Sequence, residues 1–314
     1  MKFRSNRLLI KLVLSYLVTG ALLTVLLLVV VSGFISGMIT RQANQSAREL
    51  LGNAYSTTYF ALTDAYGDFY ALWAKDPVIT EALHAAAITD ANAKAVGKLL
   101  DDAAIRDTLV HSVYLINESS GIVLSNLAGP AVRAAFYDPG ALALFQNFEN
   151  NYDRLKNEVF FPRQAAIILA GQQESRNYIS MIFTEILDGG PGQSCVIVNI
   201  DQARLSALVN TAPENNQMMI VNQSGKIISD LTGDTFAQDF PDNGLYQKIM
   251  AGQADAGSMT ADYLGNKSFI AYQKADRLGF VFISIMPYSK LMAPVNQANR
   301  TIALLFSGAI LISL

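Results

Sequence analysis

The sequence predicts an α+β fold in which a long N-terminal helix precedes two antiparallel-sheet units and transmembrane helices flank the whole. Three observations carry this prediction. An uncharged apolar segment near the N-terminus passes directly into a helical heptad pattern, strand patterns begin only at His111, and the strand patterns then repeat. With 51% hydrophobic residues and a mean hydropathy of +0.27, the 314-residue chain is also too apolar for an ordinary soluble protein.

The first apolar segment is long enough to cross a membrane. Residues 12–40 carry no charge and lie between Lys11 and Arg41, whereas a bilayer core needs about 20 helical residues. The apolar run exceeds that of a cleaved signal peptide, and no clean cleavage site follows it, so a retained anchor is favoured. Basic residues crowd its N-terminal side, which predicts a cytoplasmic tail at residues 1–11 and a transmembrane helix at residues 12–35. These basic residues are Lys2, Arg4, Arg7 and Lys11.

A second apolar segment follows Arg300. Its 14 residues, 301–314, are uncharged, but at about 1.5 Å per helical residue they are too short to cross. A chain end there would leave unpaired backbone groups and a carboxylate in hydrocarbon. We therefore expect residues 300–314 to be the truncated start of a second transmembrane helix, whether as a natural fragment or a shortened chain, with a cytoplasmic output domain beyond it. Residues 41–300 would then be extracellular.

This extracellular region is acidic. It holds all 26 acidic residues but only 19 of the 23 basic ones, which gives a net charge of −7. A surface of this charge without a basic run argues against nucleic-acid binding by residues 1–314. Cys195 is the single cysteine, so no intramolecular disulfide can form, and its setting in "SCVIVNI" is typical of a buried strand thiol.

A long stalk helix is expected over residues 36–75, because apolar residues recur at alternating spacings of four and three. Two interpretations of this seam carry equal weight: it packs on its own domain, or it pairs with a second copy as a homodimer and transmits movement to the membrane. Asp76 and Pro77 are typical of the cap and first turn of a following helix. The seam consists of Leu51, Tyr55, Thr58, Leu62, Ala65, Phe69 and Leu72.

An internal repeat divides the rest of the chain. "YLINESSGIVLSN" (residues 114–126) matches "MIVNQSGKIISD" (residues 219–230) with one deletion, and each reads as a strand, a tight turn and a return strand. "VIVNIDQARLSALVN" (196–210) likewise matches "FISIMPYSKLMAPVN" (282–296), each a strand followed by a helix start. The repeat predicts a first sheet unit at residues 76–210 and a second at residues 211–299.

This order of elements resembles the double Cache family of extracellular sensors. The resemblance covers nearly all of residues 36–300, and its most specific pieces are "YLINESSGIVLSN", "ILDGG…CVIVNID" and "FISIMPYSKL". It implies a long helix followed by a membrane-distal and a membrane-proximal PAS-like unit, each with a five- or six-stranded antiparallel sheet. The ligand of such sensors usually lies in the distal unit.

Two further stretches narrow the resemblance. "NRLLIKLVLSYL" and "SVYLINESSGIVLSN…AFYDPG" are similar to membrane-bound AraC-type transcription regulators and sensor histidine kinases of Firmicutes such as Paenibacillus. The resemblance implies a transmembrane signal-transduction sensor whose output domain is an AraC-type DNA-binding regulator or a histidine kinase. A methyl-accepting chemoreceptor shares this architecture, and a membrane-anchored extracellular binding protein is a further alternative.

Catalytic chemistry is not signalled by the residues present. The two histidines, His84 and His111, lie far apart in sequence and are interpreted as surface or half-buried residues, and the chain has no phosphate-binding glycine loop or nucleophile elbow. We expect no catalytic site, no metal site and no cofactor in these residues. A kinase activity would reside in the C-terminal continuation.

The amino-acid-binding pattern of the family is only partly present. A Y-D-P-R-x-R-x-W-Y stretch maps onto residues 137–145, where Gly140 and Leu142 replace the arginines and Leu144 replaces the tryptophan. A ligand carboxylate would there lose its charge-assisted fork. The later S-x-P-Y-x-D stretch maps onto residues 180–185, where Phe183 replaces the tyrosine and Glu185 keeps an acid.

A neutral polar ligand is therefore favoured over a free amino acid. Aromatic faces with a few polar groups suit a sugar or a short peptide. The alternative interpretation is that the aromatic residues are core, that Arg163 is a surface charge and that Asp138 only caps a turn. The candidate ligand-binding residues are Phe136, Tyr137, Asp138, Tyr152, Phe160, Phe161, Arg163, Tyr178 and Glu185.

Overall fold

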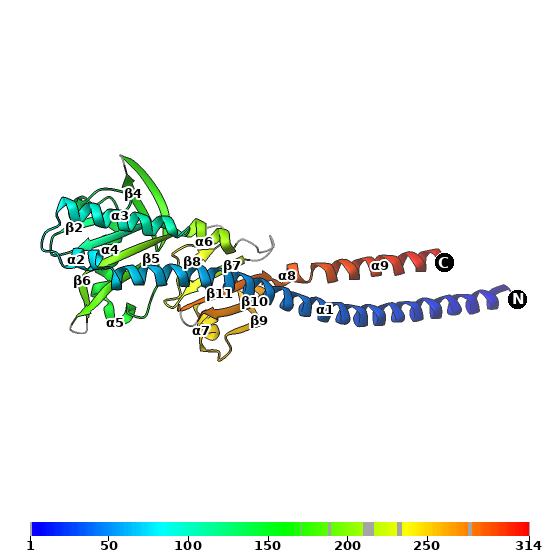
Figure 1. Ribbon diagram of the computed structural model, residues 1–314. Helices are drawn as coiled ribbons and strands as arrows, with labels where there is room; N and C mark the ends of the chain where they lie inside the picture. The colour runs from blue at the N-terminus through cyan, green and yellow to red at the C-terminus, as the bar shows by residue number, and fades with distance from the viewer. Residues whose placement is uncertain are drawn as a thin grey trace. The chain divides into compact units, whose positions relative to one another are not determined.

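A computed structural model describes residues 2–169, 171–187, 190–209, 217–230, 234–275 and 278–313 (Figure 1). A long helix leads into two antiparallel sheets with shorter helices, so the predicted α+β fold is confirmed. By its contacts the chain divides into two compact units. The larger comprises Glu49–Ser258 and Ile270–Ile285, and the smaller comprises Met1–Arg48, Met259–Phe269 and Met286–Leu314.

Helix α1 (Lys2–Lys75) is continuous, because no proline occurs within it. Its part from Lys11 onward is apolar and long enough to span a membrane, with a mean hydropathy of 2.6 in its most apolar window. Large side chains of this part, among them Leu22 and Phe34, are exposed, as lipid-facing residues would be. The carboxylate of Asp76 then accepts hydrogen bonds from the backbone N–H groups of Val78 and Ile79 and caps α2 (Pro77–His84), as predicted.

The heptad seam of α1 is buried against its own chain. Leu62 and Ala65 are fully buried, Leu51 and Phe69 nearly so, and Tyr55 makes an edge-on ring contact with Phe282. The interpretation that the seam packs on its own domain is therefore confirmed for these residues. Pairing of the long helix with a second copy stays a prediction, and Tyr55 and Leu72 of the seam are only partly buried.

The first sheet has six strands in the order β3-β2-β1-β6-β5-β4. Its strands pair in the antiparallel sense, and the hairpin predicted at residues 114–126 is present as β1 and β2. Helices α2 and α3 (Asp90–Arg106) pack on this sheet along β1 and β2, and α4 (Pro139–Asn150) packs on β4 and β6. The strands are β1 (Val110–Asn117), β2 (Ile122–Ser125), β3 (Ala131–Val132), β4 (Phe161–Leu169), β5 (Gln172–Leu187) and β6 (Gly190–Asp201).

The second sheet has five strands in the order β8-β7-β11-β10-β9. The sequence match between the two β-hairpins corresponds to a structural match, since β1–β2 and β7–β8 each turn at a glycine with positive φ, +66° at Gly121 and +78° at Gly225. Its strands are β7 (Gln217–Asn222), β8 (Ile227–Asp230), β9 (Ala256–Tyr263), β10 (Asn266–Ala275) and β11 (Phe280–Pro287). Helix α6 (Gln202–Val209) precedes β7 in the chain, and α7 (Asn243–Ala251) lies between β8 and β9.

Helix α9 (Ala293–Ser313) follows the short helix α8 (Tyr288–Leu291). Within the smaller unit, Asn299 Nδ2 donates a hydrogen bond to Ser32 Oγ at 3.0 Å, and Ser36 Oγ lies 3.6 Å from Met292 Sδ. These contacts join α9 to the first apolar segment. The helical state of residues 300–313 agrees with a second crossing, but most of the apolar side chains beyond Leu304 lie outside the described residues, so this crossing stays a prediction.

Candidate functional site

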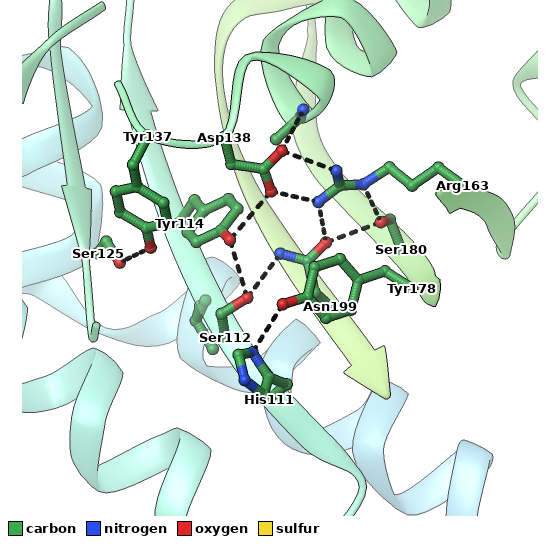
Figure 2. A network of polar contacts seen from close by, with 12 residues as sticks. His111, Ser112, Tyr114, Ser125, Tyr137, Asp138, Arg163, Tyr178, Ser180 and Asn199 are labelled. Atoms are coloured by element: carbon green, nitrogen blue, oxygen red, sulfur yellow. Dashed lines mark hydrogen bonds and ion pairs between the residues drawn. The ribbon is translucent and has the colours of Figure 1, made fainter. Parts of the chain in front are cut away.

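One face of the first sheet is covered by the segment from Phe136 to Leu155. Because strand side chains alternate between the two faces, Tyr114, Ile197 and Phe161 point to the same side and pack against Phe145 and Phe148 of α4. Polar side chains interrupt this apolar face near the start of α4. They come from four strands and converge in one buried group, shown in Figure 2.

An ion pair lies at the centre of this group. Arg163 of β4 donates from Nη1 and Nη2 to the two carboxylate oxygens of Asp138, at 2.9 and 2.7 Å. Asp138 is fully buried and the Arg163 side chain is only 9% exposed. The Asp138 carboxylate also accepts a hydrogen bond from the backbone N–H of Ala141 and so caps α4. The pair therefore joins the start of α4 to the sheet.

Two further strands accept hydrogen bonds from Arg163, and β1 continues the network. Its Nε donates to Ser180 Oγ of β5 at 2.9 Å, and Nη2 also donates to Asn199 Oδ1 of β6 at 2.9 Å. Asn199 donates in turn to Ser112 Oγ of β1, which donates to the hydroxyl of Tyr114. The Tyr114 hydroxyl closes the circuit by donating to Asp138 at 3.1 Å. We call these residues with Tyr178 and His111 the polar network.

Two tyrosines extend the group toward its edges. The guanidinium of Arg163 lies 5.1 Å from the ring centroid of Tyr178, within range of a cation–π interaction, and the Tyr178 hydroxyl lies 2.9 Å from His111 Nδ1. Tyr137 makes a 2.5 Å hydrogen bond with Ser125. Burial raises the pKa of Tyr137 to about 12 and raises that of Tyr114 further, so both hydroxyls stay protonated. Burial, aided by the charge of Arg176, lowers the pKa of His111.

Gly140 makes room for this arrangement. A β-carbon at this position would lie 3.3 Å from Arg163 Nη1 and 3.4 Å from Asp138 Oδ1. In the amino-acid-binding pattern of the family, an arginine stands at the position that corresponds to Gly140. The structure instead places a guanidinium from β4 beside it, and that guanidinium holds an internal carboxylate.

The interpretation of Arg163 as a surface charge is therefore wrong, because the side chain is buried and bonded to Asp138, Ser180 and Asn199. The expectation that Asp138 caps a turn is confirmed but incomplete, since the same carboxylate also holds Arg163.

Of the predicted ligand-binding residues, the structure brings Tyr137, Asp138, Arg163 and Tyr178 together (Figure 2). Phe136 makes ring contacts with Tyr137 and Tyr114, and the rest have other partners. Glu185 pairs with His84 at 3.0 Å, and Phe160 packs edge-on against Phe280 of β11. Phe136 and Phe161 are buried core residues, the first against Tyr114 and the second against Phe148. Tyr152 lines a separate pocket. The predicted set is thus not one site.

Sequence reasoning missed four members of the polar network: Ser112, Tyr114, Ser180 and Asn199. A signal was present for Ser112 and Tyr114, which have the spacing of one face, and for Asn199, a polar residue in the apolar run of β6. His111 was expected to be surface or half-buried and is half-buried, with a partner in Tyr178.

A pocket of about 460 Å³ lies in the same sheet unit and shares no residue with the polar network. Its walls come from α1, from β5 and from the segment after α4, and aromatic residues dominate them. The chain's single tryptophan, Trp73, is among them. The lining residues are Tyr66, Tyr70, Trp73, Phe148, Tyr152, Lys156, Glu158, Val159, Met181, Ile182, Phe183, Thr184 and Ile186. We call this the aromatic pocket.

Comparison with solved structures shows what this fold resembles. The extracellular domain of a protein named as a histidine kinase matches with a TM-score of 0.53 and 13% identity, over 79% of this chain and 97% of that one. A second such domain matches with a TM-score of 0.52 and 13% identity, over 82% and 98%. The ligand-binding domain of Mlp24, solved with asparagine, matches with a TM-score of 0.50 and 13% identity, over 83% and 99%.

These likenesses establish the fold as that of extracellular sensory domains, in agreement with the long helix and paired sheets expected from the sequence. No protein-family model matches the chain. No curated protein matches it either.

Proposed function

We propose that this chain is the sensor region of a transmembrane signalling protein, whose extracellular sheet units bind a small ligand. The observation that carries the proposal is α1, a single helix that begins in an apolar membrane segment and ends in the buried core of the first sheet unit. A helix shared in this way can report a change in the sheet unit to the membrane. The fold, which matches extracellular sensory domains, supports this function.

The proposed organisation follows the predicted boundaries. Residues 1–11 are cytoplasmic, 12–35 cross the membrane, 36–75 form the stalk, 76–210 and 211–299 are the two sensor units, and a second crossing begins at residue 300. The output domain is an AraC-type transcription regulator or a histidine kinase, and a chemoreceptor is the alternative. With any of these output domains, the chain works as a homodimer.

The ligand is a neutral polar molecule, a sugar or a short peptide, bound in the first sheet unit. The charges of the polar network favour this class over a free amino acid. Arg163, the guanidinium beside Gly140, already holds the carboxylate of Asp138 in a bidentate pair, so an incoming carboxylate would have to displace an internal one. The candidate contacts remain those proposed from the sequence, of which Tyr137 and Tyr152 are partly exposed and belong to the covering segment.

Thermal denaturation of the full chain in lipid nanodiscs tests this proposal. Monosaccharides, disaccharides, di- and tripeptides and the free amino acids are each added in a concentration series. Because a ligand at 100 times its Kd adds about 2.7 kcal/mol to the free energy of unfolding, we expect a saturable rise in Tm with at least one sugar or peptide. A rise with free amino acids alone would contradict the ligand class. No rise with any compound would contradict the sensor function.

A further inference from the structure

The aromatic pocket lies where one strand of the first sheet has no neighbour. β4 pairs with β5 only as far as Phe161 opposite Ser180, whereas β5 continues to Leu187 along β6. Among the described residues, 181–187 therefore pair with β6 on one side and with no strand on the other. The pocket occupies this open side, between α1 and the segment that leads into β4.

The wall on α1 is a continuous aromatic surface. Tyr66 and Tyr70 stack at 6.1 Å with an interplanar angle of 19°, and Tyr70 contacts Trp73 at 5.6 Å. Phe183 of β5 lies 5.4 Å from Tyr66 and 6.3 Å from Trp73, but it is buried, so Tyr66, Tyr70 and Trp73 form the accessible platform. Tyr70 is 45% exposed. Exposed aromatic surface of this extent in a concave site is characteristic of ligand pockets.

The polar groups of the pocket limit what the platform can bind. Lys156 supplies the one cation among the lining residues, and Glu158 supplies the one carboxylate. That carboxylate is already bonded to Asn222 and Ser224. A free amino acid would lack an unbonded carboxylate for its amino group among the lining residues. The remaining donors are ring N–H and hydroxyl groups, which suit a neutral ligand.

A pyranose sugar has the matching chemistry. Its C–H faces are apolar and stack on aromatic rings, while its equatorial hydroxyl groups point outward to polar partners. The volume of about 460 Å³ lies within the range of small-molecule sites. We propose that the aromatic pocket binds a mono- or disaccharide, with one sugar ring stacked on the platform of Tyr66, Tyr70 and Trp73. This inference deepens the proposed function by naming a site and a ligand class.

The chain carries its own reporter for this site, because Trp73 is the only tryptophan among its 314 residues. Tryptophan emission of the full chain in nanodiscs is recorded during titration with glucose, galactose, N-acetylglucosamine, maltose and cellobiose, and with trialanine and free amino acids as competing classes. We expect a saturable change in emission with at least one of the sugars and none with the other compounds.

Two exposed aromatic residues of α1 provide matched variants. Tyr70→Ala removes part of the platform and should weaken sugar binding about tenfold. Phe60→Ala removes a 62% exposed ring of the same helix outside the pocket and should leave the affinity unchanged. If Tyr70→Ala does not fold, Lys156→Met, at an exposed position of the pocket wall, replaces it and should weaken binding several-fold.

The inference is overturned if none of the five sugars gives a saturable change, if trialanine or an amino acid gives it instead, or if Tyr70→Ala titrates like the native chain. If the emission of Trp73 changes with protein concentration in the absence of sugar, a second copy of the chain occupies the pocket, and the sugar-binding inference is overturned. A sugar or peptide that raises Tm without changing Trp73 emission would leave the sensor function standing and place its ligand elsewhere.

Discussion

At the scale of single residues, the polar network shows how a charged pair is tolerated inside a sheet unit. Burying an ion is costly unless its hydrogen-bonding capacity is met. Each nitrogen of the Arg163 guanidinium has an acceptor, and Asp138 accepts from Arg163, Tyr114 and Ala141. The hydrogen bonds of the network thus fix the start of α4 to the sheet.

Replacement of Arg163 by methionine should destabilise the chain strongly. It leaves the fully buried Asp138 without its cation, and breaking a buried pair in this way costs about 3–5 kcal/mol. In urea denaturation, the double variant with Asp138→Asn should recover part of this loss, because asparagine still caps α4 and carries no charge. Arg154→Met, at an exposed position, is the control and should change the free energy of unfolding little. An Arg163→Met effect as small as that of the control would refute the structural role of the pair.

His111 should make stability fall in mild acid. Burial, and then the charge of Arg176, lower its pKa from 6.5 in the folded state; Arg204 acts in the same direction, and Asp201 and Glu174 oppose it. The unfolded chain therefore binds the proton first, so the stabilisation is present above pH 6.5 and is lost as pH falls through the lowered pKa.

The measurement is urea denaturation from pH 7.5 to 5. His111→Asn should lose less stability than the native chain over this range, whereas His84→Asn, at a histidine whose side chain is 54% exposed, should retain the native dependence. Equal pH slopes in the native chain and His111→Asn would contradict this role of His111.

At the scale of elements, α1 owes its place to the seam that the sequence displays. Leu62 is fully buried on this seam and Phe60 is 62% exposed two residues earlier. Leu62→Ala should lower the free energy of unfolding by about 2–5 kcal/mol through the cavity it leaves. Phe60→Ala, measured in the same way, should change it by no more than about 0.5 kcal/mol. Similar effects of the two variants would mean that the seam does not face the core.

The segment before β4 contacts the β7–β8 turn through Glu158. Its carboxylate accepts hydrogen bonds from Asn222 and Ser224, and Asn222 Oδ1 in turn accepts from the backbone N–H of Lys226 at 2.8 Å. Glu158→Gln should therefore speed hydrogen exchange of the Lys226 amide several-fold. Asp239→Asn, which removes only the exposed partner of the Lys226 side chain, serves as the control. Equal exchange rates in both variants would argue against this link.

The elements were predictable because their signals are local. The alternation of apolar residues and the repeated turns from Asn to Gly predicted the hairpins β1–β2 and β7–β8. In the first turn, Asn117 Oδ1 accepts a hydrogen bond from the backbone N–H of Ser120. The polar network was not predictable as a whole. Arg163 and Asp138 are 25 residues apart in the sequence and meet because β4 pairs with β5, which lies beside β6. The spacing of apolar residues along the sequence does not reveal this strand order. Tyr66, Tyr70 and Trp73 have helical spacing, but which face of α1 stays open depends on where β4 begins.

At the scale of the whole molecule, the proposal requires the sheet units to lie outside the cell and residues 1–11 inside it. The single native cysteine makes this directly measurable. Cys195 is fully buried, and burial raises its thiol pKa well above the usual range, so it should react negligibly with maleimides. Cysteines introduced one at a time would then report the side of the membrane on which each lies.

Labelling of intact cells with a membrane-impermeant maleimide is therefore the most direct test. The full chain carries Lys94→Cys or Asp101→Cys, both at exposed positions of α3, or Ser5→Cys in the N-terminal tail. The two α3 cysteines should be labelled in intact cells, and the Ser5→Cys chain only after the cells are permeabilised. Labelling of Ser5→Cys in intact cells, with the α3 cysteines protected until permeabilisation, would contradict the sensor topology.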